Sequence, residues 1–231
     1  MRLQVVLLDA LGTLLELEPP APHLCAELAA RGTVISEAEA AAALRAEIAY
    51  YRAHHDKAVD GAALAKLRDR CTAVLAGALP EHARDTPDLR GALLASLRFR
   101  PYPEVPEVLG ALRAAGLRLV VVSNWDVSLH EALARTGLTP LLDGAISSAE
   151  AGAAKPAPAI FARALALAGD IAPGAAVHVG DDAALDVAGA CAAGIAPVLV
   201  LRDGAVSPDG IPTLRDLRAL PELLTTYPQG R

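Results

Sequence analysis

Acidic and hydroxyl side chains follow a predicted buried strand near the start of this sequence and are able to do chemistry there. Asp9 ends the apolar run Val5–Leu8, which is typical of a strand buried on both faces. An ionised carboxylate beside such a run is costly to desolvate unless a cation or hydrogen-bond donors compensate it. The sequence therefore predicts a charged site at Asp9, with a turn and a hydroxyl next to it at Gly12 and Thr13.

Further polar residues follow two later predicted strands. Ser123 and Asn124 come after the predicted strand 117–122, and Asp181 comes after the predicted strand 175–179. The carboxyl ends of parallel strands meet at one edge of a sheet, where open α/β sheets bind ligands. Carboxylates that converge there need a cation, and oxygen ligands without histidine or cysteine favour Mg²⁺.

Other charged residues are expected to support this site. Lys155 precedes Pro156, which can start a helix, so its ammonium is placed to offset an anion or to orient a carboxylate. Asp182 opens an alanine-rich run and is expected to cap that helix. Asp186 lies one turn further on the same face, which favours a role in orienting Lys155 or a metal-bound water.

The elements that must position these residues alternate between helix and strand after residue 100. This order is the signature of βαβ units and predicts an α/β fold with a parallel sheet. The predicted strands are 117–122, 145–147, 175–179 and 197–201, and the predicted helices are 106–115, 127–136, 156–168, 183–193 and 214–224.

Residues 17–100 are predicted to form an all-helical insertion between the first strand and the rest of the sheet. A capping box at Ser36 and Glu39 starts a helix that is expected to reach about His55. Asp60 and Gly61 start the next helix, and Thr86–Pro87 a further one. An insertion at this position provides a means of excluding water from a site at the sheet edge.

Composition excludes several classes of function. The 231 residues carry a formal net charge of -6, which gives no basic footprint for nucleic acid or for an anionic membrane. No apolar stretch is long enough to span a bilayer. Three cysteines without a CxxC pair indicate neither a disulfide framework nor a thiolate metal site. We expect a soluble protein of the cytoplasm, monomeric or homodimeric.

Together, these segments resemble the four motifs of the haloacid dehalogenase (HAD) superfamily of hydrolases, in the subfamily with a helical cap between the first two motifs. DALGTL with Asp9 resembles the first motif, and the second ends in Ser123. KPAPAIF with Lys155 resembles the third motif, and GDDAALD with Asp181 and Asp186 resembles the fourth. All four occur in order and at family-like spacing.

The resemblance implies a Rossmann-like core in residues 1–16 and 101–231 and a cap in residues 17–100. It also implies hydrolysis of a small phosphorylated metabolite through an aspartyl-phosphate intermediate on Asp9, with charge balance from Lys155. The implied Mg²⁺ ligands are Asp9, the backbone carbonyl of Leu11 and Asp181, and the implied phosphate-binding residues are Ser123, Asn124 and Thr13.

The sequence departs from the common phosphatase motif at Leu11, where that motif has a second aspartate that protonates the leaving group. Dehalogenases also lack this aspartate because halide leaves without a proton, so metal-independent dehalogenation is one alternative. A protein that binds a phosphorylated ligand or a partner without turnover is another. The acidic set Asp181, Asp182 and Asp186 favours the metal-dependent phosphatase, since dehalogenases carry a more asparagine-rich fourth motif.

Aromatic residues and histidines are concentrated at one place in the predicted cap. Tyr50 with His54 and Tyr51 with His55 are pairs spaced four residues apart on one helix. One interpretation is that Tyr51, His54 and His55 contact substrate, with a histidine supplying the missing proton. The other interpretation is that this aromatic side packs into the cap.

Overall fold

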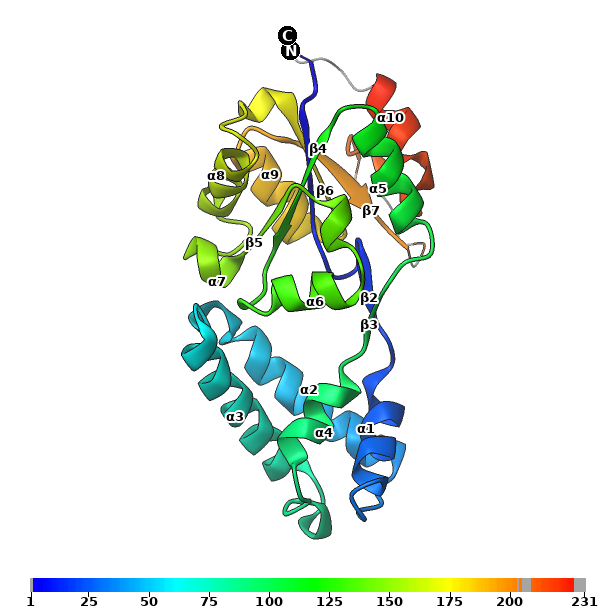
Figure 1. Ribbon diagram of the computed structural model, residues 1–231, viewed down its shortest axis with the longest axis vertical. Helices are drawn as coiled ribbons and strands as arrows, with labels where there is room; N and C mark the ends of the chain where they lie inside the picture. The colour runs from blue at the N-terminus through cyan, green and yellow to red at the C-terminus, as the bar shows by residue number, and fades with distance from the viewer. Residues whose placement is uncertain (1, 203, 205–208, 227–231) are drawn as a thin grey trace. The chain divides into compact units, whose positions relative to one another are not determined.

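Two compact units make up the chain. The structure is a computed structural model that describes residues 2–202, 204 and 209–226. Met1–Glu16 and Pro101–Arg231 form one unit, the core unit, and Leu17–Arg100 form the other, the helical unit (Figure 1). The insertion therefore leaves the core by one chain segment and returns to it by another.

A six-stranded sheet with the order β5-β4-β1-β6-β7-β8 organises the core unit. Every neighbouring pair is parallel, as the alternation of helix and strand predicts. Leu8 at the end of β1 pairs with Val121 on β4 and with Val179 on β6, so the carboxyl ends of the three strands lie at the same edge of the sheet. The strands are β1 (Val5–Leu8), β4 (Arg118–Ser123), β5 (Gly144–Ser147), β6 (Ala176–Gly180), β7 (Ala196–Val200) and β8 (Thr213–Leu214).

Helices cover both faces of this sheet, with α8 and α9 on one side and α5 and α10 on the other (Figure 1). Both faces of β1 are buried, because Val5 and Leu7 pack in one cluster with Ile160 and Phe161 of α8 while all four strand residues are inaccessible to solvent. The core helices are α5 (Val105–Ala114), α6 (Leu129–Arg135), α7 (Ser148–Ala151), α8 (Pro158–Leu167), α9 (Ala188–Ala192) and α10 (Leu220–Thr226).

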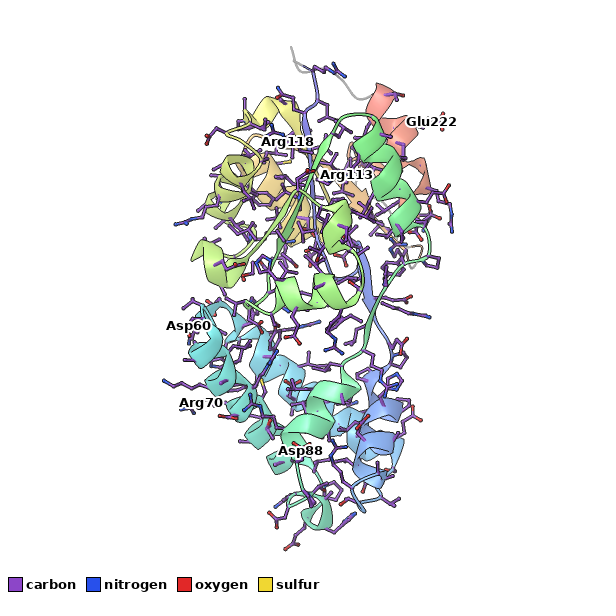
Figure 2. All side chains as sticks on the ribbon, in the orientation of Figure 1. Asp60, Arg70, Asp88, Arg113, Arg118 and Glu222 are labelled. Carbon is purple, nitrogen blue, oxygen red and sulfur yellow. The ribbon has the colours of Figure 1, made fainter. Side chains whose placement is uncertain are left out.

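Four helices form the helical unit around their own leucine- and alanine-rich core. They are α1 (Pro20–Ala29), α2 (Glu37–Arg52), α3 (Gly61–Ala78) and α4 (Leu89–Ser96). The predicted capping box at Ser36 and Glu39 is formed, and Asp60 and Asp88 cap the starts of α3 and α4 (Figure 2). Within residues 2–202, 204 and 209–226, no helix has the length and apolar character needed to cross a membrane.

Several predicted boundaries are wrong. The helix α2 ends at Arg52 rather than near His55, where the His54 ring hydrogen-bonds the Tyr50 carbonyl at 2.7 Å. The helix α4 begins at Leu89 instead of Thr86, because the Asp88 side chain accepts a hydrogen bond from the Gly91 amide.

Short strands account for the remaining differences. The segments that connect the two units pair as a two-stranded sheet, β2 (Leu15–Leu17) with β3 (Phe99–Pro101). The predicted tail helix 214–224 begins too early: Leu214 belongs to β8 beside β7, residues 217–219 form a short 3-10 helix, and α10 begins only at Leu220. The predicted helix 183–193 consists of a π-helical turn at Ala183–Val187 followed by α9.

Candidate active site

Asp9 lies just beyond the end of β1, at the edge where β4 and β6 also end. Its amide donates to the Val179 carbonyl at 2.9 Å, which extends the sheet by one hydrogen bond. Only 6% of the residue is exposed. Ser123, the last residue of β4, donates its hydroxyl to Asp9 Oδ1 at 3.0 Å. The sheet register alone thus brings two of the predicted site residues into contact.

The Lys155 ammonium links two buried carboxylates. Its Nζ atom lies 2.5 Å from Asp9 Oδ1 and 2.6 Å from Asp186 Oδ1. Burial would lower the pKa of Lys155, but the charges of Asp9 and Asp186 outweigh burial and raise it. Burial raises the pKa of Asp9 against the opposing effect of Lys155. Lys155 is therefore a fixed cation that orients both carboxylates.

The Asn124 side chain holds the backbone of Lys155. Its Oδ1 accepts from the Lys155 amide at 2.7 Å, and its Nδ2 donates to the Lys155 carbonyl at 3.0 Å. The peptide bond between Lys155 and Pro156 is cis. The side chain of Asn124 thus joins the end of β4 to the loop that carries Lys155, and binding of phosphate by the Asn124 amide stays a prediction.

Asp186 receives hydrogen bonds from three directions. Besides Lys155, His178 on β6 lies 2.8 Å from its Oδ1, and the Asp182 amide donates to its Oδ2 at 3.0 Å. Burial would raise the pKa of Asp186, but the bond from His178 and the charge of Lys155 hold it well below its usual range. A Cβ atom on Gly180 would lie 2.1 Å from the Asp186 Cγ, so this packing requires glycine.

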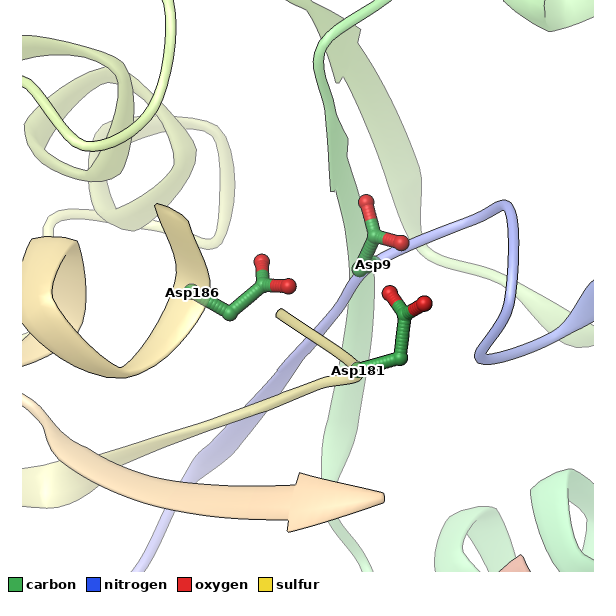
Figure 3. Close-up of side chains that lie close together, drawn as sticks. All are labelled: Asp9, Asp181 and Asp186. Atoms are coloured by element: carbon green, nitrogen blue, oxygen red, sulfur yellow. The ribbon is translucent and has the colours of Figure 1, made fainter. Parts of the chain in front are cut away.

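Asp181 completes a group of three carboxylates with Asp9 and Asp186 (Figure 3). One oxygen from each lies within 4.8 Å of the others. Burial, together with the negative charges of Asp9 and Asp186, raises the pKa of Asp181 to about 7. Such crowding of oxygen ligands suits Mg²⁺, and because Asp186 is already bonded to Lys155 and His178, Asp9 and Asp181 are the residues that would hold the ion directly.

The loop after Asp9 leaves room for Asp181 only because of Gly12. Its φ is +86°, and a Cβ atom there would lie 2.1 Å from Asp181 Oδ2. Leu11 is 38% exposed, so an aliphatic side chain occupies the surface beside the site. Thr13 is fully buried, and its hydroxyl has no hydrogen-bond partner among the described residues.

The three predicted substrate contacts Tyr51, His54 and His55 belong to the helical unit. Tyr50 and Tyr51 pack against the core of that unit. The rings of Tyr50 and His54 stack with centroids 4.1 Å apart, and those of Tyr51 and His55 are tilted at 5.5 Å. Packing accounts for the buried part of both tyrosines, and contact of Tyr51, His54 and His55 with substrate stays a prediction.

Two residues with contacts in or next to the site were missed. His178 follows a valine in a buried strand and is itself fully inaccessible, so its position resembles that of any strand residue. Its separation of eight residues from Asp186 gives no helical or strand periodicity to detect. Arg202 contacts the Asp9 loop from the far end of the sequence, and no local pattern predicts this.

Comparisons with known proteins agree with this arrangement. A family model described as haloacid dehalogenase-like hydrolase matches residues 3–194. Phosphoserine phosphatase from Thermus thermophilus is 38% identical over 148 residues, which are 62% of this chain and 58% of that protein. The chain spans about half the length of the curated relatives it matches.

Solved structures of two enzyme types are similar to the chain. A HAD phosphatase from Thermococcus onnurineus is 26% identical with a TM-score of 0.68, and the match covers 96% of this chain and 98% of that one. A 2-haloacid dehalogenase from Pseudomonas syringae has the same identity, TM-score and coverage. With a family model matching most of its length, this chain belongs to the haloacid dehalogenase-like hydrolases.

Proposed function

We propose that the protein is a Mg²⁺-dependent phosphatase that acts on a small phosphorylated metabolite through Asp9. One observation carries this choice: Lys155 forms ion pairs with Asp9 and Asp186, while Asp181 belongs to the same group of carboxylates and takes no part in those ion pairs. A second cation is needed to stabilise Asp181 in its ionised form next to Asp9. Mg²⁺ would supply that charge and would bind a phosphoryl oxygen.

In the proposed reaction, each step is assigned to residues of the site. An oxygen of Asp9 attacks phosphorus while the bond from phosphorus to the leaving oxygen breaks, and water then hydrolyses the aspartyl phosphate. Lys155 and Ser123 bind Asp9 Oδ1 and so fix the plane of the attacking carboxylate. Ser123, the Asn124 amide and Thr13 are the proposed phosphate contacts. Among the similar proteins are a phosphoserine phosphatase, a ribulose-1,5-bisphosphate 5-phosphatase and a glyceraldehyde 3-phosphate phosphatase, which supports this choice of reaction.

Leu11 restricts the substrates that this mechanism serves well. A leucine side chain cannot donate a proton to a leaving alkoxide, and general acid catalysis is typically worth about 10²–10⁴-fold. Phosphate esters of acidic alcohols or phenols need this proton least. We therefore expect faster turnover of aryl phosphates than of alkyl phosphates.

The helical unit is the proposed cap, with residues 1–16 and 101–231 as the catalytic core. Its insertion directly after the Asp9 loop supports this role, since substrate selection needs surfaces outside the reacting groups of the core. Replacement of His54 or His55 by alanine tests the unit: a change in KM supports substrate contact, and unchanged kinetics in both variants removes it. Cys25, Cys71 and Cys191 form no disulfide within the described part of the chain, which suits the proposed cytoplasmic location.

Dehalogenation is the second candidate, favoured by Leu11 and by the similarity to a 2-haloacid dehalogenase. In that reaction Asp9 displaces halide from carbon, and no proton or metal is required. The three carboxylates argue against it, because the single positive charge of Lys155 is shared by Asp9 and Asp186 and a further cation is needed beside Asp181.

Hydrolysis of p-nitrophenyl phosphate with and without Mg²⁺ separates the candidates, measured for the wild type, Asp9→Asn and Leu11→Asp. The phosphatase predicts turnover that requires Mg²⁺ and disappears in Asp9→Asn, and a gain in Leu11→Asp with alkyl phosphates. Release of chloride from 2-chloropropionate in EDTA would instead establish the dehalogenase. If no variant shows either activity, the remaining alternative is a protein that binds a phosphorylated ligand or a partner without turnover.

A further inference from the structure

Arg202 connects the end of β7 to the loop that follows Asp9. Its Nε atom donates to the Gly12 carbonyl at 3.1 Å, and its Nη2 atom donates to the Thr13 carbonyl at 2.7 Å. One guanidinium thus binds two consecutive carbonyls that are 190 and 189 residues away in sequence. A planar fork of donors is suited to two acceptors at once, whereas a lysine ammonium is a point charge.

The guanidinium is itself held on two further sides. Its Nη1 atom lies 2.7 Å from Glu104 Oε1, and its carbon lies 3.4 Å from the centroid of the Tyr102 ring. Glu104 is only 5% exposed. Burial would raise the pKa of Glu104, but hydrogen bonds from its own amide and from Arg202 lower it. A charge-assisted pair and a stacked ring leave Arg202 little rotational freedom.

The carbonyls that Arg202 binds lie in a tight loop beside the carboxylates. The Gly12 amide donates to the Leu15 carbonyl at 2.7 Å, and the amides of Leu14 and Leu15 both donate to the Ala10 carbonyl at 2.8 Å. Gly12 also packs directly against Asp181, so closely that no other side chain fits at this position. Movement of the Gly12 carbonyl would therefore shift the backbone next to both Asp9 and Asp181.

We propose that Arg202 is a positioning residue for the reaction at Asp9, which it reaches by fixing the backbone of the loop 10–15. The identity of the reaction rests on the proposed function, whereas the effect of Arg202 on the backbone of this loop does not depend on it. Arg202 donates to the backbone of this loop, and its effect on Asp9 and Asp181 passes through Gly12 and Thr13.

Three variants test the role: Arg202→Ala, Arg202→Lys and, as a matched control, Arg218→Ala. Arg218 is an arginine of the same unit whose side chain is 65% exposed and pairs with Asp216. The assay is p-nitrophenyl phosphate hydrolysis with Mg²⁺ varied, at a temperature where thermal melting shows each variant to be fully folded.

For Arg202→Ala we expect kcat to fall, or the half-activating Mg²⁺ concentration to rise, by about 10–100-fold, as is typical when a group that orients metal ligands is removed. Arg202→Lys is expected to recover part of the loss, and Arg218→Ala to keep full activity. Unchanged kcat and unchanged Mg²⁺ dependence in Arg202→Ala, with only a lower melting temperature, would overturn the proposal and leave a purely structural contact.

Hydrogen exchange of the metal-free protein gives a readout that does not depend on turnover. Loss of the guanidinium is expected to speed exchange of the Gly12, Leu14 and Leu15 amides in Arg202→Ala but not in Arg218→Ala. Unchanged exchange would overturn the proposal even if activity fell. Where the wild type hydrolyses no phosphate ester, the proposed function fails, and exchange together with calorimetric Mg²⁺ affinity decides the role of Arg202.

Discussion

The Nζ atom of Lys155 lies 2.5 Å from Asp9 Oδ1, so a buried ion pair joins the loop before α8 to the end of β1. The same ammonium bonds to Asp186, and the side chain is only 2% exposed. One cation thus compensates two carboxylates that would otherwise repel each other in the interior.

Replacement of Lys155 by methionine is therefore expected to destabilise the core unit by about 3–5 kcal/mol, because it leaves buried carboxylates unpaired. Urea unfolding measures the loss. Lys66→Met is the control, since Lys66 is exposed on α3 and its loss should stay within about 0.5 kcal/mol. Equal stability of both variants would contradict the ion pair's role.

His178 is expected to stabilise Asp186 through its Nε2 hydrogen. The ring is buried edge-on against Phe161, with centroids 4.9 Å apart, and its Nδ1 atom has no partner among the described residues. His178→Leu should cost about 1–3 kcal/mol by removing the donor, whereas His178→Gln should recover part of this. A leucine variant as stable as the wild type in thermal and urea unfolding would refute the prediction.

Asp181 should make the stability of the metal-free protein depend on pH. Its folded pKa of about 7 lies above its usual value of 3.8, so the stability it contributes is present below about pH 4 and is lost as pH rises through 7. Asp181→Asn should therefore gain stability relative to the wild type between pH 4 and 8, on the order of 1 kcal/mol after solvent screening.

Melting curves in EDTA across this pH range measure the difference between the two proteins. Added Mg²⁺ should raise the melting temperature of the wild type above pH 7, and that of Asp181→Asn much less, by mass action on the folded state. If the difference in melting temperature between the wild type and Asp181→Asn does not grow with pH, ionisation of Asp181 does not destabilise the folded protein.

Glu47 is expected to limit the stability of the helical unit at neutral pH. The residue is 3% exposed on α2, and burial raises its pKa against the opposing effect of a hydrogen bond with Cys71. A raised pKa means that its stabilising contribution is lost as pH rises above the usual range for glutamate.

The neutral variant Glu47→Gln should therefore melt higher at pH 8, by about 2–4 °C for a gain near 1 kcal/mol, and show no advantage at pH 4. Glu37→Gln, a change at an exposed position of the same helix, is the control and should show no such gain. A fall in melting temperature of Glu47→Gln at pH 8 would contradict this account.

The residues at the sheet edge were predictable because the same pattern, a largely apolar segment followed by polar residues, occurs at the end of several strands. That signal located Asp9, Ser123 and Asp181 from the sequence alone. Lys155 and Asp186 followed from their position relative to these strand ends.

What the sequence could not predict depends on contacts between distant elements. The bond from His178 to Asp186 forms because Gly180 lacks a side chain and because a π-helical turn carries Asp186 back over β6. Neither condition is visible in hydrophobic spacing. Short strands such as β2 and β8 have two or three residues and no period to detect.

The central place of β1 also sets an order of assembly. Its two neighbours, β4 and β6, are made far later, since Val5 pairs with Arg118 and Ala176. The helical unit is continuous in sequence and finds all its partners early. During synthesis, the strand that carries Asp9 therefore cannot complete its pairing until β4 and β6 have emerged, and the last of the three clustered carboxylates arrives only with Asp186.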